Sequence, residues 1–546
     1  MNVEFTTLKR RNNNKRKEEF TMGLFNLRKT YTGDVPPKST SAIYCGASTF
    51  RDACYQLVSG FLITYITLSG VLDADPTAFM AQITTISVIT IVCLVWDGLN
   101  DPIMGWIIEK VHFKSGNKYK PWILIGGILN TGVVLTLFLA HPRGWGFVGL
   151  FTVFYFLWDI VWTINDIAYW SMLPSLTKDE ARRNKITSIM QICISVGVFG
   201  VYGAVPMLVG AFDGVSAQTV YGVIAIVVCT LFLLSQIVLV LFCKEHKEEK
   251  VEGQPEEEVK FKDMITLFKK NDQFRVNIVA ILLDYLGAGI VVGFGMYYFY
   301  LRYGYGSENG GAIQFMFTIM YAVGTLLAQV AYPFLSKVLK RKNIFLLSFI
   351  TILVGYLLLF FVGFPVFGNN VVADPKSWTI WILYASGAIL FFGQGLHAVA
   401  VIMQMQSTIE YNEYKFGERK EALVSSMRAL VAKFGSAIQR LLIFLTLLIS
   451  GLYAISQVIS NSEAELASGS MTSEQLTQEI DAARETITNG QWLVFSIGML
   501  WIPLILLSVS LFLSRFVFKI DEDKYQEIVN ELNARKKAAP EAEKTE

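Results

Sequence analysis

Twelve long apolar segments restrict how this chain can fold more than any other feature of its sequence. Each can cross the roughly 30 Å hydrocarbon core of a bilayer as an α-helix, which takes about 20 residues. Charged residues make up only 17% of the chain and hydrophobic residues 53%, which excludes a set of soluble domains. The predicted spans are 42–72, 77–109, 120–140, 146–175, 183–210, 218–243, 274–302, 310–336, 342–364, 378–406, 422–453 and 491–518. We therefore expect an all-α membrane protein with twelve transmembrane helices.

The charges between the spans predict how the protein is oriented. Lys and Arg gather in every second connection. These basic connections are the N-terminal segment, 110–120, 178–185, 244–270, 337–342 and 415–420. Connections rich in Lys and Arg remain on the cytoplasmic side of a membrane. Both termini are therefore expected in the cytoplasm, in a multi-pass protein of the cell (plasma) membrane.

A charged connection at 244–273 divides the spans into six plus six. The predicted organisation is a cytoplasmic N-terminal segment (1–41), a six-helix bundle (42–243), the cytoplasmic central loop (244–273), a second bundle (274–518) and a cytoplasmic tail (519–546). Within the second bundle, residues 453–490 form an acidic external insertion with helical spacing. Two interpretations of the insertion stay open, namely a solvated helical hairpin and an amphipathic cap.

The second span contains an acidic cluster between Trp96 and Gly105. Asp97 and Asp101 are four residues apart, so a helix places both carboxylates on one face, with Asn100 beside them. A carboxylate at the bilayer centre costs roughly 2.5–3.5 kcal/mol on insertion scales, and two on one face also repel each other. The cluster indicates a cation site, and an interhelical hydrogen-bond network without an ion is the alternative.

The fourth span carries Thr163, Asp166 and Trp170 on one face. Asp97 and Asp166 are at similar depth, so the second and fourth spans can share a site. Hydroxyl, amide and carboxylate oxygens are hard ligands, which suit Na⁺ or Li⁺ better than a soft metal. The six cysteines include no CxxC pair, so neither a disulfide nor a metal cofactor is expected.

Cationic side chains also lie at membrane depth. Arg51 and Asp52 are near the middle of the first span, and because adjacent residues do not share a helix face, Arg51 need not neutralise Asp52 directly. A structural ion pair with another helix is the alternative to a substrate role. In the eleventh span, Lys433 and Arg440 share a face. For Arg440 two roles stay open, which are contact with a substrate and an ion pair with Asp284 of the seventh span.

Four motifs connect the chain with a known family. They are WDGLNDPIMGWI (96–107), KYKPWILIG (118–126), NDIAYWSMLPSLTKDEARR (165–183) and EYNEYKFGERKEA (410–422). Together they resemble the glycoside–pentoside–hexuronide:cation symporters over most of residues 40–520, except the insertion. The resemblance implies the major facilitator fold, with two six-helix bundles around a central cavity. It also implies cation-coupled sugar uptake by alternating access.

The resemblance assigns roles by position. The residues that resemble the family's cation ligands are Asp97, Asn100, Asp101 and Thr163. Those that resemble its sugar-binding positions are Arg51, Asp52, Asp166 and Trp170, and Lys433 matches a coupling lysine near both sites. Two positions depart from the family, because Gln191 stands where an arginine is expected and Ala398 lies near the place of a tryptophan. Arg440 has no counterpart, and a substrate carboxylate would suit it, which favours a hexuronide.

The predicted function is secondary active transport of a sugar or glycoside with a monovalent cation. Na⁺ is the expected coupling ion, with Li⁺ and H⁺ as alternatives. A proton-coupled sugar symporter and a major-facilitator lipid or drug transporter with the same cation motif are the rival functions. The sequence has no nucleophile elbow, phosphate loop or zinc spacing. We therefore expect neither an enzyme nor a resident cofactor, and no nucleic-acid partner.

Overall fold

The computed structural model describes residues 30–31, 36–111, 113, 118–177, 180–246, 261–366, 372–418 and 420–542. Most of the predicted N-terminal segment and residues 247–260 of the central loop lie outside them. Within this part of the chain, 11 helices are long and apolar enough to cross a membrane. The helix α2 (Lys38–Leu68) is a further long helix packed among them. The predicted helical membrane fold is confirmed, while the side on which the termini lie stays a prediction.

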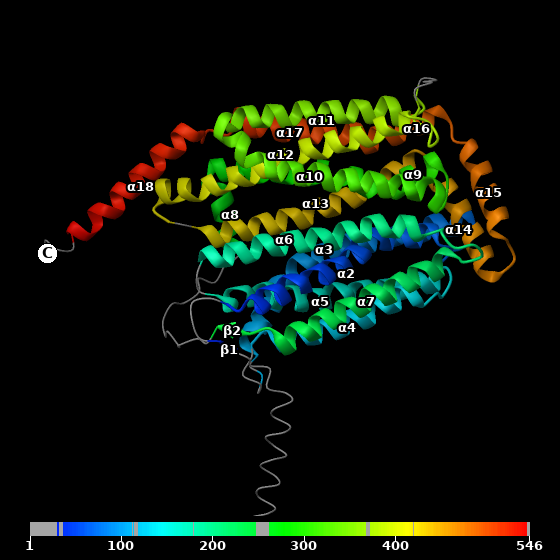
Figure 1. Ribbon diagram of the computed structural model, residues 1–546, viewed down its shortest axis with the longest axis horizontal. Coiled ribbons are helices and arrows are strands. Elements are labelled where there is room, and N and C mark those ends of the chain that lie inside the picture. Colours follow the sequence, from blue (N-terminus) through cyan, green and yellow to red (C-terminus); the bar gives the residue numbers. More distant parts are fainter. Residues whose placement is uncertain are drawn as a thin grey trace, which may run out of the picture.

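The helices form two layers, which Figure 1 shows one above the other with their axes across the view. The first layer, here the N half, consists of α2, α3 (Pro76–Lys110), α4 (Lys120–Leu139), α5 (Trp145–Leu176), α6 (Glu180–Leu208) and α7 (Ala217–Phe242). The second layer, the C half, consists of α9 (Asp272–Tyr303), α10 (Ala312–Val338), α11 (Arg341–Gly363), α12 (Thr379–Phe416), α13 (Glu421–Ile449) and a last span. That span joins α16 (Asn489–Ser496), η3 (Ile497–Trp501), α17 (Ile502–Phe512) and η4 (Leu513–Val517).

The smaller elements lie at the ends of the layers. The strands β1 (Thr30–Tyr31) and β2 (Glu245–His246) pair in parallel, and α8 (Phe261–Lys270) precedes α9. A short turn, η1 (Ser307–Gly311), precedes α10. The helix α12 extends past its predicted span to Phe416. The C-terminal helix α18 (Glu522–Ala542) lies at the left-hand end in Figure 1.

Local sequence signals fix where the central helices begin and how the halves meet. The side chain of Asp75 accepts a hydrogen bond from the Ala78 N–H at 2.9 Å, and Pro76 occupies the first turn of α3. The halves then meet where α3 packs on α13 and α6 packs on α10. Because α13 lies against α3, Lys433 can reach the acidic cluster of the second span.

The predicted external insertion is a helical hairpin of α14 (Tyr453–Ser468) and α15 (Ser473–Glu485). Gly469 ends α14 with a positive φ of +74°, and a capping box of Thr472 and Gln475 begins α15. The hairpin lies across the right-hand end of both layers in Figure 1. We call this the hairpin end of the molecule.

Glu463 of the hairpin joins the two halves. Its side chain is 1% exposed, and its two carboxylate oxygens accept from the Ala217 N–H at 2.6 Å and from the Tyr305 O–H at 2.5 Å. Ala217 belongs to the N half and Tyr305 to the C half. Burial raises the pKa of the Glu463 carboxyl to about 7, although both hydrogen bonds act to lower it. One carboxyl group therefore fastens both halves at this end.

The halves also touch directly at the hairpin end. The Tyr300 O–H donates to the Pro206 carbonyl at 3.0 Å. Gly210 and Gly306 both have positive φ, and a Cβ atom on Gly210 would lie 2.7 Å from the Gly306 Cα atom. Only glycine permits this close approach of two backbones. The N and C halves are thus held together at the hairpin end.

Candidate functional site

A cavity of about 230 Å³ lies between α2, α3 and α5 of the N half and α13 of the C half. We call it the charged chamber. Its charged lining residues are Arg51, Asp52, Asp97, Asp101, Asp159, Asp166, Lys433 and Arg440. Its lining also includes Thr163 and the aromatic residues Tyr55, Tyr155, Trp158, Trp162 and Trp170. Nine of the eleven residues predicted for cation, sugar or coupling roles therefore line one cavity, and Asn100 and Gln191 do not.

Lys433 crosses from the C half to the acidic cluster of the N half. Its Nζ atom lies 2.9 Å from Asp97 Oδ2 and also contacts the Asp101 carboxylate. The two acids of the second span thus share an ammonium group that the chain itself supplies. Because the ion pairs are only partly exposed, they are stronger than surface pairs and connect the two halves.

Thr163 brings a hydroxyl from α5 to the same carboxylates. Its Oγ1 atom donates to the Asp159 carbonyl at 2.9 Å and lies 3.5 Å from Asp101 Oδ1. The site that the sequence predicts between the second and fourth spans is therefore present as a set of converging oxygens. Asn100 is 3% exposed, and its amide nitrogen has no hydrogen-bond partner within the described ranges. Its role as a cation ligand stays a prediction.

Asp159 is a chamber residue that the sequence interpretation missed. It is 9% exposed, and its Oδ2 atom has no hydrogen-bond partner in the described part of the chain. Asp159 precedes Thr163 by four residues and Asp166 by seven, so all three lie on one face of α5. Extending the predicted polar face by one turn would have found it.

Arg51 binds two carboxylates from deep burial, since its side chain is 2% exposed. Its Nη2 atom lies 2.9 Å from Asp52 Oδ2, and its Nη1 atom lies 3.1 Å from Asp166 Oδ1. Arg51 reaches its sequence neighbour Asp52 because its long side chain turns back, and it also forms the ion pair with another helix that was the alternative to a substrate role. The guanidinium also lies 4.3 Å from the Tyr169 ring centroid, within reach of a cation–π interaction.

Arg440 extends from α13 into the N half. Its Nη1 atom donates to Tyr155 Oη at 2.6 Å, and its Nη2 atom lies 3.5 Å from the Ser59 carbonyl. The alternative of an ion pair with Asp284 was wrong. Asp284 lies within the C half instead, with its Oδ1 atom 3.8 Å from His397 Nε2. Opposite charge suggested the pair, but charge alone does not show which neighbours the two side chains face.

Gln191 lies away from the charged chamber. Its side chain is exposed on α6, and it does not line the cavity. Its predicted role in substrate binding stays a prediction. Asn165, beside Asp166, also points elsewhere, since its Nδ2 atom donates to the Ile123 carbonyl at 2.9 Å.

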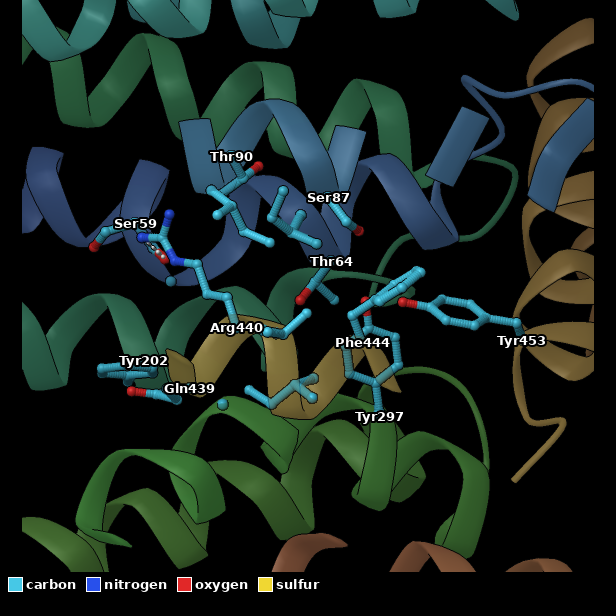
Figure 2. A pocket seen from close by; sticks show the side chains of 16 residues that line it. Ser59, Thr64, Ser87, Thr90, Tyr202, Tyr297, Gln439, Arg440, Phe444 and Tyr453 are labelled. Carbon is cyan, nitrogen blue, oxygen red and sulfur yellow. Dashed lines mark hydrogen bonds between the residues drawn. The ribbon is translucent and has the colours of Figure 1, made fainter. Parts of the chain in front are cut away.

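A second cavity of about 110 Å³ lies on the hairpin side of Arg440. Figure 2 shows Arg440 at one side of it, and Tyr453 pointing in from the hairpin toward Phe444 and Tyr297. We call it the hydroxyl chamber because Ser59, Thr64, Ser87, Thr90, Tyr202, Tyr297 and Tyr453 are in its lining. Arg440 is the residue common to the two linings. The two chambers are therefore neighbours along one path between the halves.

Comparison with known proteins relates this chain to membrane transporters of sugars. The family model described as MFS/sugar transport protein matches residues 55–522. The raffinose carrier protein of Pediococcus pentosaceus is 26% identical over 502 residues, covering 90% of this chain and 70% of that protein. The lactose permease of Leuconostoc lactis is 26% identical over 503 residues, covering 88% and 69%. The glucuronide carrier protein homolog of Escherichia coli (strain K12) is 21% identical over 350 residues, covering 63% and 71%.

Solved structures support the fold. A bacterial homolog of the human lysosomal transporter Spinster matches with a TM-score of 0.54 at 12% identity, covering 87% of this chain and 96% of the other. The nucleoside transporter NupG matches with a TM-score of 0.51 at 11% identity, covering 86% and 99%. The apolar helices and these relatives identify a multi-pass protein of the cell membrane. The chain therefore belongs to the MFS/sugar transport protein family, among the glycoside–pentoside–hexuronide type of major-facilitator transporters.

Proposed function

We propose that this protein imports a sugar or glycoside together with Na⁺ by alternating access. The observation that carries the proposal is the position of Lys433 between Asp97 and Asp101, at the contact of the two halves. A cationic group already occupies the oxygen-rich site where the coupling ion would bind. Relatives that are named raffinose carrier, lactose permease and glucuronide carrier support a sugar as the substrate.

The proposed coupling is an exchange of cations at one pair of carboxylates. Asp97, Asp101 and the Thr163 hydroxyl offer hard oxygen atoms that suit Na⁺. When Na⁺ takes over the carboxylates of α3, Lys433 of α13 loses its partners. The ion thereby weakens a contact between the halves and changes the relative stability of the carrier's conformations, which is the requirement for alternating access.

The proposed sugar site adjoins the ion site through α5. Asp166 lies one turn after Thr163, and its carboxylate is tied to Arg51 and, through Arg51, to Asp52. These groups can accept from and donate to sugar hydroxyls, and Trp170 offers a face for the ring. Because one helix carries residues of both sites, ordering it for one ligand favours the other. By linkage, the sugar then raises the affinity for the ion by the same factor.

A proton-coupled carrier is the second candidate. It is favoured by Asp159, a nearly buried residue of the charged chamber whose carboxyl has an unpaired oxygen within the described residues. Such a group could take up a proton in place of a metal ion. A lipid or drug transporter fits less well, because eight charged side chains line the chamber.

Uptake into proteoliposomes tests the proposal. Labelled neutral glycosides and glucuronides are offered with an inward Na⁺ gradient at equal pH on both sides, and separately with an inward H⁺ gradient in the absence of Na⁺ and Li⁺. Accumulation above the outside concentration is expected with Na⁺ alone. Accumulation with the H⁺ gradient alone would establish the second candidate. Preference for glucuronides over the neutral glycosides would support a substrate that carries a carboxylate, and its loss in Arg440→Gln would assign that carboxylate to Arg440.

A further inference from the structure

The hydroxyl chamber continues the charged chamber along the helix axes. On three helices, a residue of one chamber is two turns away from a residue of the other. Two turns are seven residues, or about 10.5 Å along a helix. The pairs are Asp52 and Ser59 on α2, Thr90 and Asp97 on α3, and Lys433 and Arg440 on α13. The second cavity is thus displaced toward the hairpin end by about 10 Å, on helices from both halves.

Three polar side chains of the hydroxyl chamber are held in place by hydrogen bonds to backbone carbonyls, two within α3 and one between α13 and α9. Ser87 Oγ donates to the Ile83 carbonyl and Thr90 Oγ1 to the Ile86 carbonyl, both at 2.8 Å. A hydroxyl that donates its hydrogen keeps two lone pairs as acceptors. Gln439 Nε2 likewise donates to the Gly289 carbonyl at 2.7 Å. The chamber therefore offers acceptors in fixed positions, which suit a ligand that brings its own O–H donors.

The hydroxyl chamber differs from its neighbour in charge. Among the described residues that line it, Arg440 is the single charged side chain, with no carboxylate or lysine beside it there. Tyr202, Phe444 and Tyr453 add aromatic walls, which Figure 2 shows around the polar groups. Acceptor oxygens beside aromatic faces suit the O–H groups and the C–H faces of a neutral sugar ring.

We propose that the hydroxyl chamber binds the second glycosyl ring of a neutral oligosaccharide whose first ring occupies the charged chamber. The proposal rests on the proposed function and names the substrate class more narrowly. Arg440, which lines both cavities, lies where the linkage between the two rings passes. The charged chamber then takes any substrate of the carrier, and the hydroxyl chamber distinguishes oligosaccharides from single-ring glycosides.

A substitution in the hydroxyl chamber tests the proposal. Thr90 is 5% exposed, and Thr90→Val keeps its shape while removing the acceptor oxygen. The KM for raffinose, which has three rings, should rise about three- to tenfold, as expected for one lost hydrogen bond. The KM for methyl α-galactoside, which has one ring, should stay within about twofold. Both are measured by Na⁺-driven uptake into proteoliposomes.

Thr85→Val is the matched control. Thr85 lies on the same helix, its Oγ1 atom makes the same kind of bond to the Ala81 carbonyl at 2.8 Å, and it lines neither chamber. It should change neither KM. The inference would be overturned if Thr90→Val changed the KM of both sugars equally or left that of raffinose unchanged. It would also be overturned if the wild-type protein took up only the single-ring sugar. In each case the proposed sugar transport itself would still stand. If no sugar is taken up by the wild type under any ion gradient, the proposed function itself is wrong.

Discussion

The two chambers share Arg440, yet their linings use different chemistry. The charged chamber has five carboxylates and three cationic side chains, and ion pairs cross it from one half to the other. The hydroxyl chamber has neutral acceptors, of which Ser87 and Thr90 are bonded within their own helix. Ion pairs across a boundary respond to a bound cation, whereas fixed hydroxyls do not. The proposed ion coupling therefore depends on the charged chamber alone, and the hydroxyl chamber can be altered without touching the proposed ion site.

Removing one carboxylate of the charged chamber should have the largest effect. Asp97→Asn and Asp101→Asn keep the side-chain volume but delete the charge that holds Lys433 and the proposed ion. Na⁺-stimulated uptake should fall about 100-fold or more, because the chamber loses one ligand of the proposed ion together with one partner of a partly buried charge pair. Initial rates in proteoliposomes with and without the Na⁺ gradient measure this ratio.

Asp284→Asn provides the comparison with another buried acid. Asp284 is 6% exposed and lies outside both chambers. Its loss should lower protein stability while the ratio of rates with and without Na⁺ stays at the wild-type value. A carrier that still concentrates sugar after Asp97→Asn or Asp101→Asn would contradict the assignment of the ion site.

The hairpin contributes to the wall of the hydroxyl chamber and not to that of the charged chamber, since Tyr453 lines the first and not the second. Gly70 has a φ of +76°, and a Cβ atom there would lie 2.7 Å from the Ala464 nitrogen and the Ser460 carbonyl oxygen of the hairpin. Gly70→Ala should therefore loosen the docking of the hairpin. Gly469→Ala, at a φ of +74° with nothing within 4 Å, carries the backbone strain without the collision.

Hydrogen exchange of the α15 amides measures the docking in both variants. The loss of protection in Gly70→Ala should exceed that in Gly469→Ala by about 30-fold, or ~2 kcal/mol, which is typical of overpacking against fixed atoms. Equal losses would mean that the hairpin does not press on Gly70 in solution.

A change of pH should also alter how strongly the hairpin docks, while the hydroxyl groups of the hydroxyl chamber keep their protons. The Glu463 carboxyl has a pKa of about 7 when docked, above its usual 4.5, so the docked form binds more protons between these values. The docking therefore weakens as pH rises through this window. Raising the pH from 6 to 8 should lower the equilibrium constant for docking of the hairpin about tenfold.

Within the described residues, the titratable groups that interact with Glu463 are the hydroxyls of Tyr221, Tyr300 and Tyr305. None of them ionises below pH 8, so the change belongs to the carboxyl. Glu463→Gln should remove the pH dependence of α15 hydrogen exchange after correction for intrinsic rates. A pH dependence that survives in this variant would assign the effect to another group.

Lys433 offers the smallest and most specific test of the charged chamber. If its ammonium competes with the coupling ion, Lys433→Gln should lower the half-saturating Na⁺ concentration about fivefold, or ~1 kcal/mol. Trp158 and Trp162 line the chamber, so tryptophan fluorescence reports the titration. Lys340→Gln, at an exposed lysine paired with Asp523, should have no effect. Weaker Na⁺ binding in Lys433→Gln would show that the lysine supports the ion instead of competing with it.

Hydrophobic pattern and helical periodicity predicted much of this molecule. Apolar segment length gave the spans, and the spacing of Asp97 and Asp101 gave one acidic face. Depth along the helices placed Asp97 and Asp166 at one level, and the family resemblance placed Lys433 near them; both residues and the lysine line the charged chamber. The same reasoning missed Asp159 only because the face of α5 was ended one turn too early.

The sequence pattern could not predict how each helix is rotated about its axis or which distant segments touch. Arg440 and Asp284 have opposite charges, but the structure points Arg440 at Tyr155 of the other half. Glu463 meets Ala217 and Tyr305, which are 246 and 158 residues away in sequence. An acidic insertion looks solvated when its partners are a backbone N–H and a tyrosine hydroxyl, since neither is marked by an opposite charge.

The imbalance of charge in the charged chamber has an electrical consequence. With every carboxylate ionised, five acids and three cations leave a formal charge of −2, and one Na⁺ makes it −1. A membrane potential does about 2.3 kcal/mol of work per elementary charge over 100 mV. Because the cytoplasm is at a negative potential, it repels the empty chamber with its charge of −2 more strongly than the loaded chamber with −1. Voltage should accelerate the return of the unloaded carrier to the outside, in addition to drawing the cation inward.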